Sequence, residues 1–289
     1  MSNLLLKLIK FGIGFVLFIP LYIGGSFFFP FIFPKIWLFQ LVVEIIFFFY
    51  IILALADPKY RPKFNRVMGV LALLILVLII TSFTGIDAYR SFWGNTERMS
   101  GVISLIHFAA AAVILLGVFK TEKEWQAYFG IAVLVGVLEF FYVLLQYFGA
   151  SFVWMPGAQI GTIGNADLLG SFTIFNAFFA LYLWRNNLKS DFKNFPKSDF
   201  GWFWAAAFFM NIGTLYFAGS RGAMLGFVSG IFIYALANVW RKPETLKIWG
   251  IVGGVLVFSY LILFLARNTS FVANNYQLGR ITRISIQDR

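Results

Sequence analysis

One arginine separates two long apolar stretches of this chain, and it is the strongest candidate for chemistry. Ser220, Arg221 and Gly222 lie between the apolar segments 202–218 and 223–239. A guanidinium stays charged at ordinary pH, and placing one at the centre of a membrane helix costs roughly 2.5–3.5 kcal/mol. Its planar set of N–H donors matches the oxygens of a phosphate group. The pattern predicts an anion site at Arg221; an arginine that extends to the lipid headgroups is the simpler alternative.

A glycine-rich segment, residues 157–170, places Asn165 and Asp167 at the expected mouth of a helix. Glycines let backbone amides approach a ligand, and a helix N-terminus favours anions. Because Asp167 would repel a phosphate, we expect it to orient an arginine or an acceptor hydroxyl. Either residue could instead be a simple N-cap, and Ser220 could cap the helix that follows it. Asn165, Asp167 and Ser220 are therefore candidate substrate-binding residues beside Arg221.

The segment 85–101 is a third candidate, because it combines two arginines and two acids with aromatic residues. Arg98 could help to hold an anionic headgroup, with Trp93 beside it as a surface for a sugar or a lipid. Alternatively, Glu97 and Arg98 pair with each other or cap the next helix, and Trp93 belongs to an interfacial aromatic belt.

Three ionisable residues lie deeper in apolar segments: Glu44, Glu139 and His107. Buried carboxyl groups in membranes are protonated, paired or lining water. We expect structural hydrogen bonds between helices for all three, with proton coupling as the alternative for the two acids. His107 is the one side chain whose ordinary pKa suits a general base.

The composition requires that these residues be positioned by membrane helices. Hydrophobic residues make up 61% of the 289 residues, aromatic residues 20% and charged residues only 12%, and the mean hydropathy is +0.84. Apolar stretches long enough to cross about 30 Å of hydrocarbon recur along the chain. We therefore predict an all-α fold, a polytopic transmembrane helix bundle of about nine spans. The spans are expected near residues 11–33, 36–56, 67–84, 100–119, 127–148, 166–184, 202–219, 223–240 and 248–266.

The basic residues favour a cytoplasmic N-terminus. With that orientation, cytoplasmic segments hold fifteen of the 23 lysines and arginines, as the positive-inside rule requires. The net charge of +11 is then mainly a topology signal, and we predict a membrane partner and no nucleic acid. The absence of cysteine and the single histidine exclude thiolate and multi-histidine metal sites, so we predict no metal and no cofactor.

The polar end of the chain differs from the rest. Residues 1–266 are expected to form the helical bundle, and residues 267–289 to begin an extracytoplasmic loop. That tail has four arginines and one acid, Asp288, and ends abruptly at Arg289. We expect the chain to be the N-terminal piece of a longer protein.

Three motifs and the end of the chain resemble parts of the O-antigen ligase, O-antigen polymerase and pilin-oligosaccharyltransferase superfamily. Residues 217–226 (FAGSRGAMLG) resemble its arginine motif, and residues 161–170 (GTIGNADLLG) resemble the preceding helix entrance. Residues 91–101 (SFWGNTERMSG) resemble its early outer loop, and residues 280–289 resemble the lead-in to its large periplasmic loop.

The resemblance implies a metal-independent membrane glycosyltransferase of the GT-C type in the bacterial cytoplasmic membrane. Such proteins move a glycan from undecaprenyl diphosphate to lipid A–core, a polysaccharide or a protein at the periplasmic face. It implies that Arg221 binds the donor diphosphate as the catalytic residue, and that Arg98 and Asp167 contact substrate. The family's second arginine and its histidine belong to the large loop, where this sequence ends, and His107 does not match that histidine.

A transporter or flippase for a lipid-linked or small anionic substrate is the alternative, with Glu44, Glu139 and Asp167 as proton carriers. The position of Arg221 at an outer turn and the lack of a detectable internal repeat argue against it.

Overall fold

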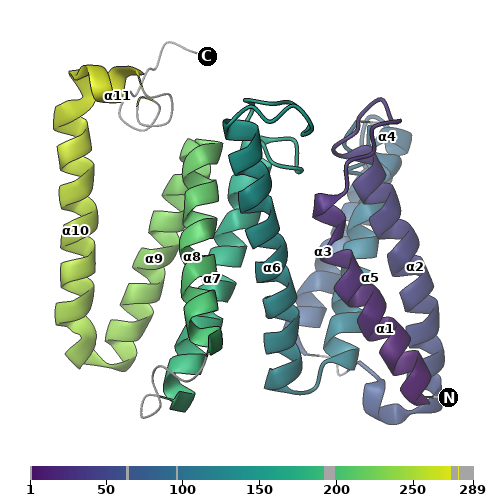
Figure 1. Cartoon of the computed structure of the whole chain (residues 1–289). Helices are drawn as coiled ribbons and strands as arrows, with labels where there is room; N and C mark the ends of the chain where they lie inside the picture. Colours follow the sequence, from purple (N-terminus) through teal and green to yellow (C-terminus); the bar gives the residue numbers. More distant parts are fainter. Residues whose placement is uncertain (1, 63–64, 96, 192–198, 275–278, 280–289) are drawn as a thin grey trace. The chain divides into compact units, whose positions relative to one another are not determined.

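The computed structural model describes residues 2–62, 65–95, 97–191, 199–274 and 279, and every regular element in this part of the chain is helical (Figure 1). The chain divides into two compact units, residues 1–135 with 162–164 and residues 136–161 with 165–289. The predicted all-helical fold is therefore confirmed over the described residues.

The first unit is built from α1, α2, α3 and α5, with shorter elements between them. Its elements are α1 (Ser2–Val16), η1 (Ile19–Leu21), α2 (Phe33–Ala56), η2 (Pro58–Tyr60), α3 (Arg66–Thr84), α4 (Ala88–Trp93), α5 (Val102–Val118) and the first half of α6 (Glu122–Tyr147). The second unit contains the rest of α6, α7 (Ala166–Asp191), α8 (Asp199–Ala218), α9 (Arg221–Arg241), η3 (Pro243–Thr245), α10 (Leu246–Leu265), η4 (Ala266–Asn268) and α11 (Ser270–Asn274).

Five helical segments of the described chain are long and apolar enough to cross a membrane, as expected of a multi-pass membrane protein. They are Ser2–Leu21, Phe33–Ala56, Glu122–Tyr147, Ala166–Asn187 and Arg221–Arg241. Helices also cover the other predicted spans except the first, while the total of nine stays a prediction.

The first predicted span, residues 11–33, is wrong. The helical segment begins at Ser2 and ends at Leu21, and residues 22–32 are not helical. Pro20 lacks the N–H that would continue the α-helix, and its ring opposes the preceding turn, so α1 gives way to a short 3-10 helix. The Gly24 N–H then bonds to the Pro30 carbonyl (3.0 Å), which folds the apolar residues between them into a loop.

The core of the first unit joins the beginning of α1 to the ends of α2 and α5. Leu5 and Ile9 of α1 belong to one buried cluster with Leu53 of α2, Tyr60 of η2 and Val118 of α5. The cluster therefore lies at the end of the first unit that also holds its basic connecting segments.

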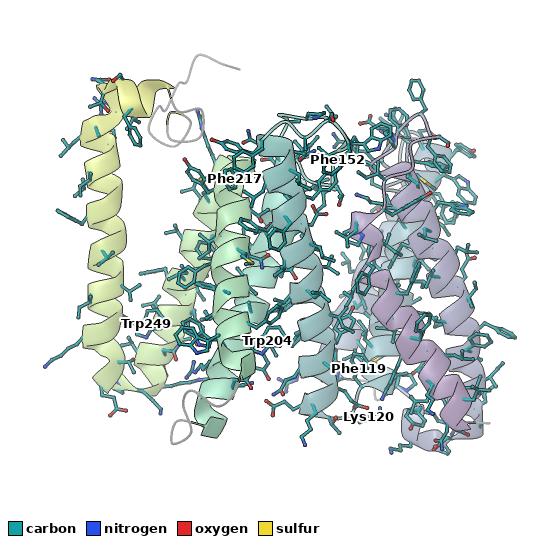
Figure 2. All side chains as sticks on the ribbon, viewed as in Figure 1. Phe119, Lys120, Phe152, Trp204, Phe217 and Trp249 are labelled. Atoms are coloured by element: carbon teal, nitrogen blue, oxygen red, sulfur yellow. The ribbon has the colours of Figure 1, made fainter. Side chains whose placement is uncertain are left out.

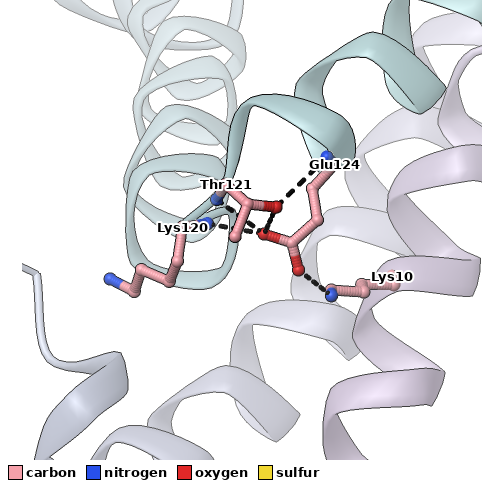
Figure 3. Close-up of polar contacts among 4 residues, drawn as sticks. All are labelled: Lys10, Lys120, Thr121 and Glu124. Carbon is pink, nitrogen blue, oxygen red and sulfur yellow. Dashed lines mark hydrogen bonds and ion pairs between the residues drawn. The ribbon is translucent and has the colours of Figure 1, made fainter.

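An ion pair joins α1 to the start of α6 at the same end (Figure 3). Lys10 Nζ lies 2.5 Å from Glu124 Oε1. Glu124 Oε2 accepts hydrogen bonds from the backbone N–H groups of Lys120 (2.8 Å) and Thr121 (2.9 Å), while the Thr121 hydroxyl accepts from the Glu124 N–H (3.3 Å). This reciprocal capping box explains why α6 begins where it does.

Close packing of α7 against α8 forms the centre of the second unit. Small buried residues, among them Ala177, Ala180 and Ala207, allow the two backbones to approach. The helices α9 and α10 follow as a hairpin through η3. Trp249 of α10, labelled in Figure 2, makes a T-shaped contact with Tyr234 of α9, with ring centroids 5.5 Å apart. The tail residues 275–278 and 280–289, including Arg280, Arg283 and Arg289, lie outside the described residues.

Candidate functional site

The turn between α8 and α9 presents Arg221. Gly219 follows the last residue of α8 with φ 62°, in the left-handed region that favours glycine, and its N–H bonds to the Tyr216 carbonyl (3.1 Å). Ser220 is then the N-cap of α9, because its hydroxyl accepts a hydrogen bond from the Ala223 N–H (3.3 Å). Arg221 is consequently the first residue of α9.

The entrance of α7 is capped by Asn165. Its Oδ1 accepts from the N–H groups of Asp167 (2.9 Å) and Leu168 (3.1 Å), while its carbonyl accepts from the Leu169 N–H (2.9 Å). The alternative that Asn165 is an N-cap is therefore confirmed. Asp167 is the second residue of α7, so its carboxylate lies at the positive end of the helix dipole.

The N-termini of α7 and α9 meet, and a glycine allows it. A Cβ atom on Gly170 would lie 2.5 Å from the Ala223 Cβ and 3.4 Å from the Ser220 Cβ, so any other residue would force the two helices apart. At this distance the Ser220 hydroxyl, which is buried, donates to Asp167 Oδ1 (2.5 Å). The fold thus brings Asn165, Asp167, Ser220 and Arg221 together, although 53 residues separate Asp167 from Ser220.

Arg221 is exposed beside this junction, and its guanidinium has no ion-pair partner among the residues that the structure describes. The N–H groups of Arg221 and Gly222 belong to the first turn of α9, where the helix supplies no acceptor. A Cβ on Gly222 would meet nothing within 4 Å, so this glycine leaves open space rather than narrowing the turn. A guanidinium, two free amides and two adjacent helix N-termini suit a phosphate or diphosphate.

Arg98 lies in the first unit, whereas the other four candidates lie in the second. Its backbone N–H bonds to Asn95 Oδ1 (2.9 Å), and its exposed guanidinium has Nε 3.9 Å from Glu97 Oε1. The geometry supports the alternative in which Arg98 and Glu97 pair loosely. An exposed ion pair at this distance contributes little to the stability of the fold.

The two deep ionisable residues predicted in the first unit, Glu44 and His107, are paired with each other, although the Glu44 side chain is 64% exposed and not buried as expected. His107 is buried, and its Nε2 lies 3.1 Å from Glu44 Oε1 across α5 and α2. Its Nδ1 lies 2.7 Å from the Ile103 carbonyl oxygen, one turn earlier in α5. The expected hydrogen bonding between helices is confirmed for this pair, but the sequence did not predict that the two residues are each other's partners.

The second unit contains a buried polar group that sequence reasoning mostly missed. Its fully or nearly fully buried members are Glu139 and Gln146 on α6, Thr173 and Asn176 on α7, and Asn211 and Thr214 on α8. Of these residues, only Glu139 was predicted to form structural hydrogen bonds between helices. The others could have been found from sequence because each is a polar side chain in the middle of an apolar span. Gln146 holds the 148–161 segment against α6, because it donates to the Trp154 carbonyl (2.8 Å) and accepts from the Gly161 N–H (2.8 Å).

Comparisons of this chain with known protein families, with characterised proteins and with solved structures found no match. The described residues also contain no group of three or more histidine, cysteine, aspartate or glutamate side chains that could hold a metal ion. A functional assignment must therefore be argued from the α7–α9 junction itself.

Proposed function

We propose that this chain is an O-antigen ligase-like membrane glycosyltransferase. It moves a glycan from an undecaprenyl diphosphate donor to a lipid, polysaccharide or protein acceptor, at the outer face of the bacterial cytoplasmic membrane. The observation that carries the proposal is the exposed Arg221 at the joined N-termini of α7 and α9.

The junction supplies what a diphosphate leaving group needs. The Arg221 guanidinium accepts the charge that develops on the diphosphate as its bond to the sugar breaks, and the amides of Arg221 and Gly222 donate hydrogen bonds to the same oxygens. The backbone donors are fixed by the first turn of α9, so they require no reorganisation during the reaction. The apolar helices beside the junction leave the polyprenyl tail in lipid.

Asp167 and Ser220 act as positioning residues in this proposal. The Asp167 carboxylate is engaged by the Ser220 hydroxyl, which holds the two helix ends in register and keeps the acid hydrogen-bonded. Asn165 caps α7 in the same cluster. Arg98, which pairs loosely with Glu97, has no role in this junction. The GT-C-like arrangement and the periplasmic side of the site are parts of the proposal.

Donor binding by the purified chain in nanodiscs tests the role of Arg221. Arg221→Ala should weaken undecaprenyl diphosphate binding by about 10- to 100-fold, the usual cost of losing a charged hydrogen bond. Arg221→Lys should be impaired as well, because an ammonium makes no bidentate contact. Arg241→Ala is the matched control, since Arg241 is the last residue of the same helix and is also exposed.

Equal binding by the wild type and Arg221→Ala would contradict the proposal. Glycan transfer is measured separately in cells that express the protein, where loss of transfer in Arg221→Ala with normal membrane insertion is the expected result.

A further inference from the structure

Near the C-terminal ends of α7 and α9, one arginine is held in place by neutral side chains. The Nη1 atom of Arg185 on α7 donates hydrogen bonds to the Tyr234 hydroxyl and to Asn238 Oδ1 (3.2 Å), both on α9. The guanidinium also lies over the Tyr234 ring, with its Cζ 5.9 Å from the ring centroid. Trp249 of α10 packs against the same ring. Three helices therefore fix the position of Arg185.

The opposite edge of this guanidinium is left for a ligand. Nη1 makes both of the bonds above, whereas Nε and Nη2 donate to none of the side chains or carbonyls that the structure describes. No carboxylate of the described residues pairs with Arg185. The Nε and Nη2 groups form a planar fork that matches two oxygens of one phosphate. The Tyr234 hydroxyl accepts from Arg185 and keeps its own hydrogen for the same ligand.

Arg185 lines a cavity of about 330 Å³ between α7, α9 and α10, which is within the size range of small-molecule sites. This space, the Arg185 cavity, has mainly aromatic walls with a few polar groups, as ligand sites usually have. Its lining residues are Leu181, Trp184 and Arg185 of α7, Tyr234 and Asn238 of α9, Thr245 of η3 and Trp249 of α10.

A second, apolar cavity of about 170 Å³ lies between α9 and α10. This α9–α10 cavity is lined by Val228, Ile231, Phe232 and Ala235 of α9 and by Trp249, Val252 and Gly253 of α10. Trp249, labelled in Figure 2, lines both cavities, so the two are neighbours. A Cβ on Gly253 would meet nothing within 4 Å, so no described part of the chain fills this space. The α9 residues that line it belong to a helix able to span the membrane.

The two neighbouring cavities together favour an amphipathic anion. Arg185 offers a charge and a fork of donors, and the α9–α10 cavity offers apolar surface at membrane depth. The adjoining ends of α9 and α10 carry three basic residues and one acid: Arg241, Lys242, Lys247 and Glu244. Basic pockets between membrane helices on the cytoplasmic side bind the headgroups of anionic lipids.

We propose that the Arg185 cavity and the α9–α10 cavity together bind one anionic phospholipid. Its phosphate receives hydrogen bonds from Nε and Nη2 of Arg185 and from the Tyr234 hydroxyl, and an acyl chain lies between α9 and α10. About 25 Å of helix separates Asn238 from Arg221, so the lipid occupies the leaflet opposite to the α7–α9 junction. The site is independent of the proposed glycan transfer.

Native mass spectrometry of the purified chain in a non-ionic detergent tests the site with two lipids. The wild type should bind one phosphatidylglycerol about 10-fold more tightly than phosphatidylcholine, whose ammonium group would lie among the basic residues. Equal affinity for the two lipids would overturn the proposal. Inorganic phosphate in large excess should not displace phosphatidylglycerol. Displacement would identify a site for a free anion and would also overturn the proposal.

Charge variants locate the lipid. Arg185→Gln should remove the preference for phosphatidylglycerol, and an unchanged preference would contradict the proposal. Arg241→Gln is the matched control: it removes the same charge at the same end of the unit without lining either cavity, so it should keep most of the preference. Arg221→Ala should keep the preference as well. Its loss in Arg221→Ala would place the lipid at the α7–α9 junction and overturn the proposal.

A pair of glycine variants covers the case in which Arg185→Gln does not fold. Gly253→Leu fills the α9–α10 cavity and should weaken phosphatidylglycerol binding by about 10-fold, because the acyl chain loses apolar contact. Gly254→Leu is the control and should bind like the wild type. A Cβ on Gly254 also meets nothing within 4 Å, but this residue does not line the cavity. Equal binding by the two variants would overturn the proposal.

Discussion

Gly219 and Gly222 flank the same arginine, but they contribute differently. Gly219 has φ 62°, a conformation that costs a residue with a side chain roughly 1–2 kcal/mol. Gly222 lies in the first turn of α9 with open space around its missing side chain. Substitutions at the two glycines therefore test two different properties. Gly219 reports on the backbone conformation of the turn, and Gly222 reports on the free space beside Arg221.

We expect Gly219→Ala to lower the free energy of unfolding by about 1–2 kcal/mol. Gly222→Ala should leave it unchanged or raise it by up to about 1 kcal/mol, since alanine loses less backbone entropy in a helix. Denaturant or thermal unfolding in detergent measures both. Equal destabilisation by the two substitutions would contradict the assignment of the left-handed turn to Gly219.

The caps of the candidate site could be predicted from sequence, while their partners could not. Asn165 and Ser220 were candidate caps because capping depends only on the residues that follow within one turn. The bond between Asp167 and Ser220 and the bond between Glu44 and His107 join helices far apart in the chain. Such bonds depend on which helix faces pack together, and a single sequence does not specify that.

The approach of α7 to α9 rests on Gly170. Its missing side chain places Ala223 of α9 directly against the α7 backbone, one turn from Asp167. Farther along the same interface, a Cβ on Gly226 would meet only the end of the Ile174 side chain, at 3.5 Å, which is an ordinary contact.

Gly170→Ala should therefore separate the two helix ends and break the hydrogen bond between Ser220 and Asp167. We expect a loss of about 1–3 kcal/mol in the free energy of unfolding, typical of overpacking, together with weaker donor binding. Gly226→Ala is the control: it should leave donor binding unchanged and should leave the free energy of unfolding unchanged or raise it by up to about 1 kcal/mol. Unaltered stability and binding in Gly170→Ala would show that the helices can adjust without cost.

The helices themselves were largely predictable, because long apolar runs and polar breaks determine them. All eight later spans begin or end within a few residues of prediction, and the failure at residues 11–33 has a local cause in Pro20. The short helix α4 was not predicted, although Asp87 caps it by accepting from the Arg90 N–H (2.9 Å). A six-residue helix is too short to produce a periodic signal.

The orientation of the chain can be tested with cysteine labelling, because the sequence has no cysteine of its own. Ser220 is unsuitable because it is buried, whereas Gly222 is exposed and has open space around it. We expect a membrane-impermeant maleimide to label Gly222→Cys in intact spheroplasts. Lys123→Cys, at the basic end of the first unit, should react only after permeabilisation. The reverse pattern would place Arg221 on the cytoplasmic side and end the proposal of an extracytoplasmic transferase.

The bond between His107 and Glu44 has a consequence for proton transfer. The Nδ1 atom must carry hydrogen, because its neighbour, the Ile103 carbonyl oxygen, can only accept. Its Nε2 lies 3.1 Å from Glu44 Oε1, so both ring nitrogens of His107 have partners within the first unit. The sole imidazole of this chain is thus fully engaged within its own bundle, and an acceptor hydroxyl in the proposed reaction must give its proton to a different base.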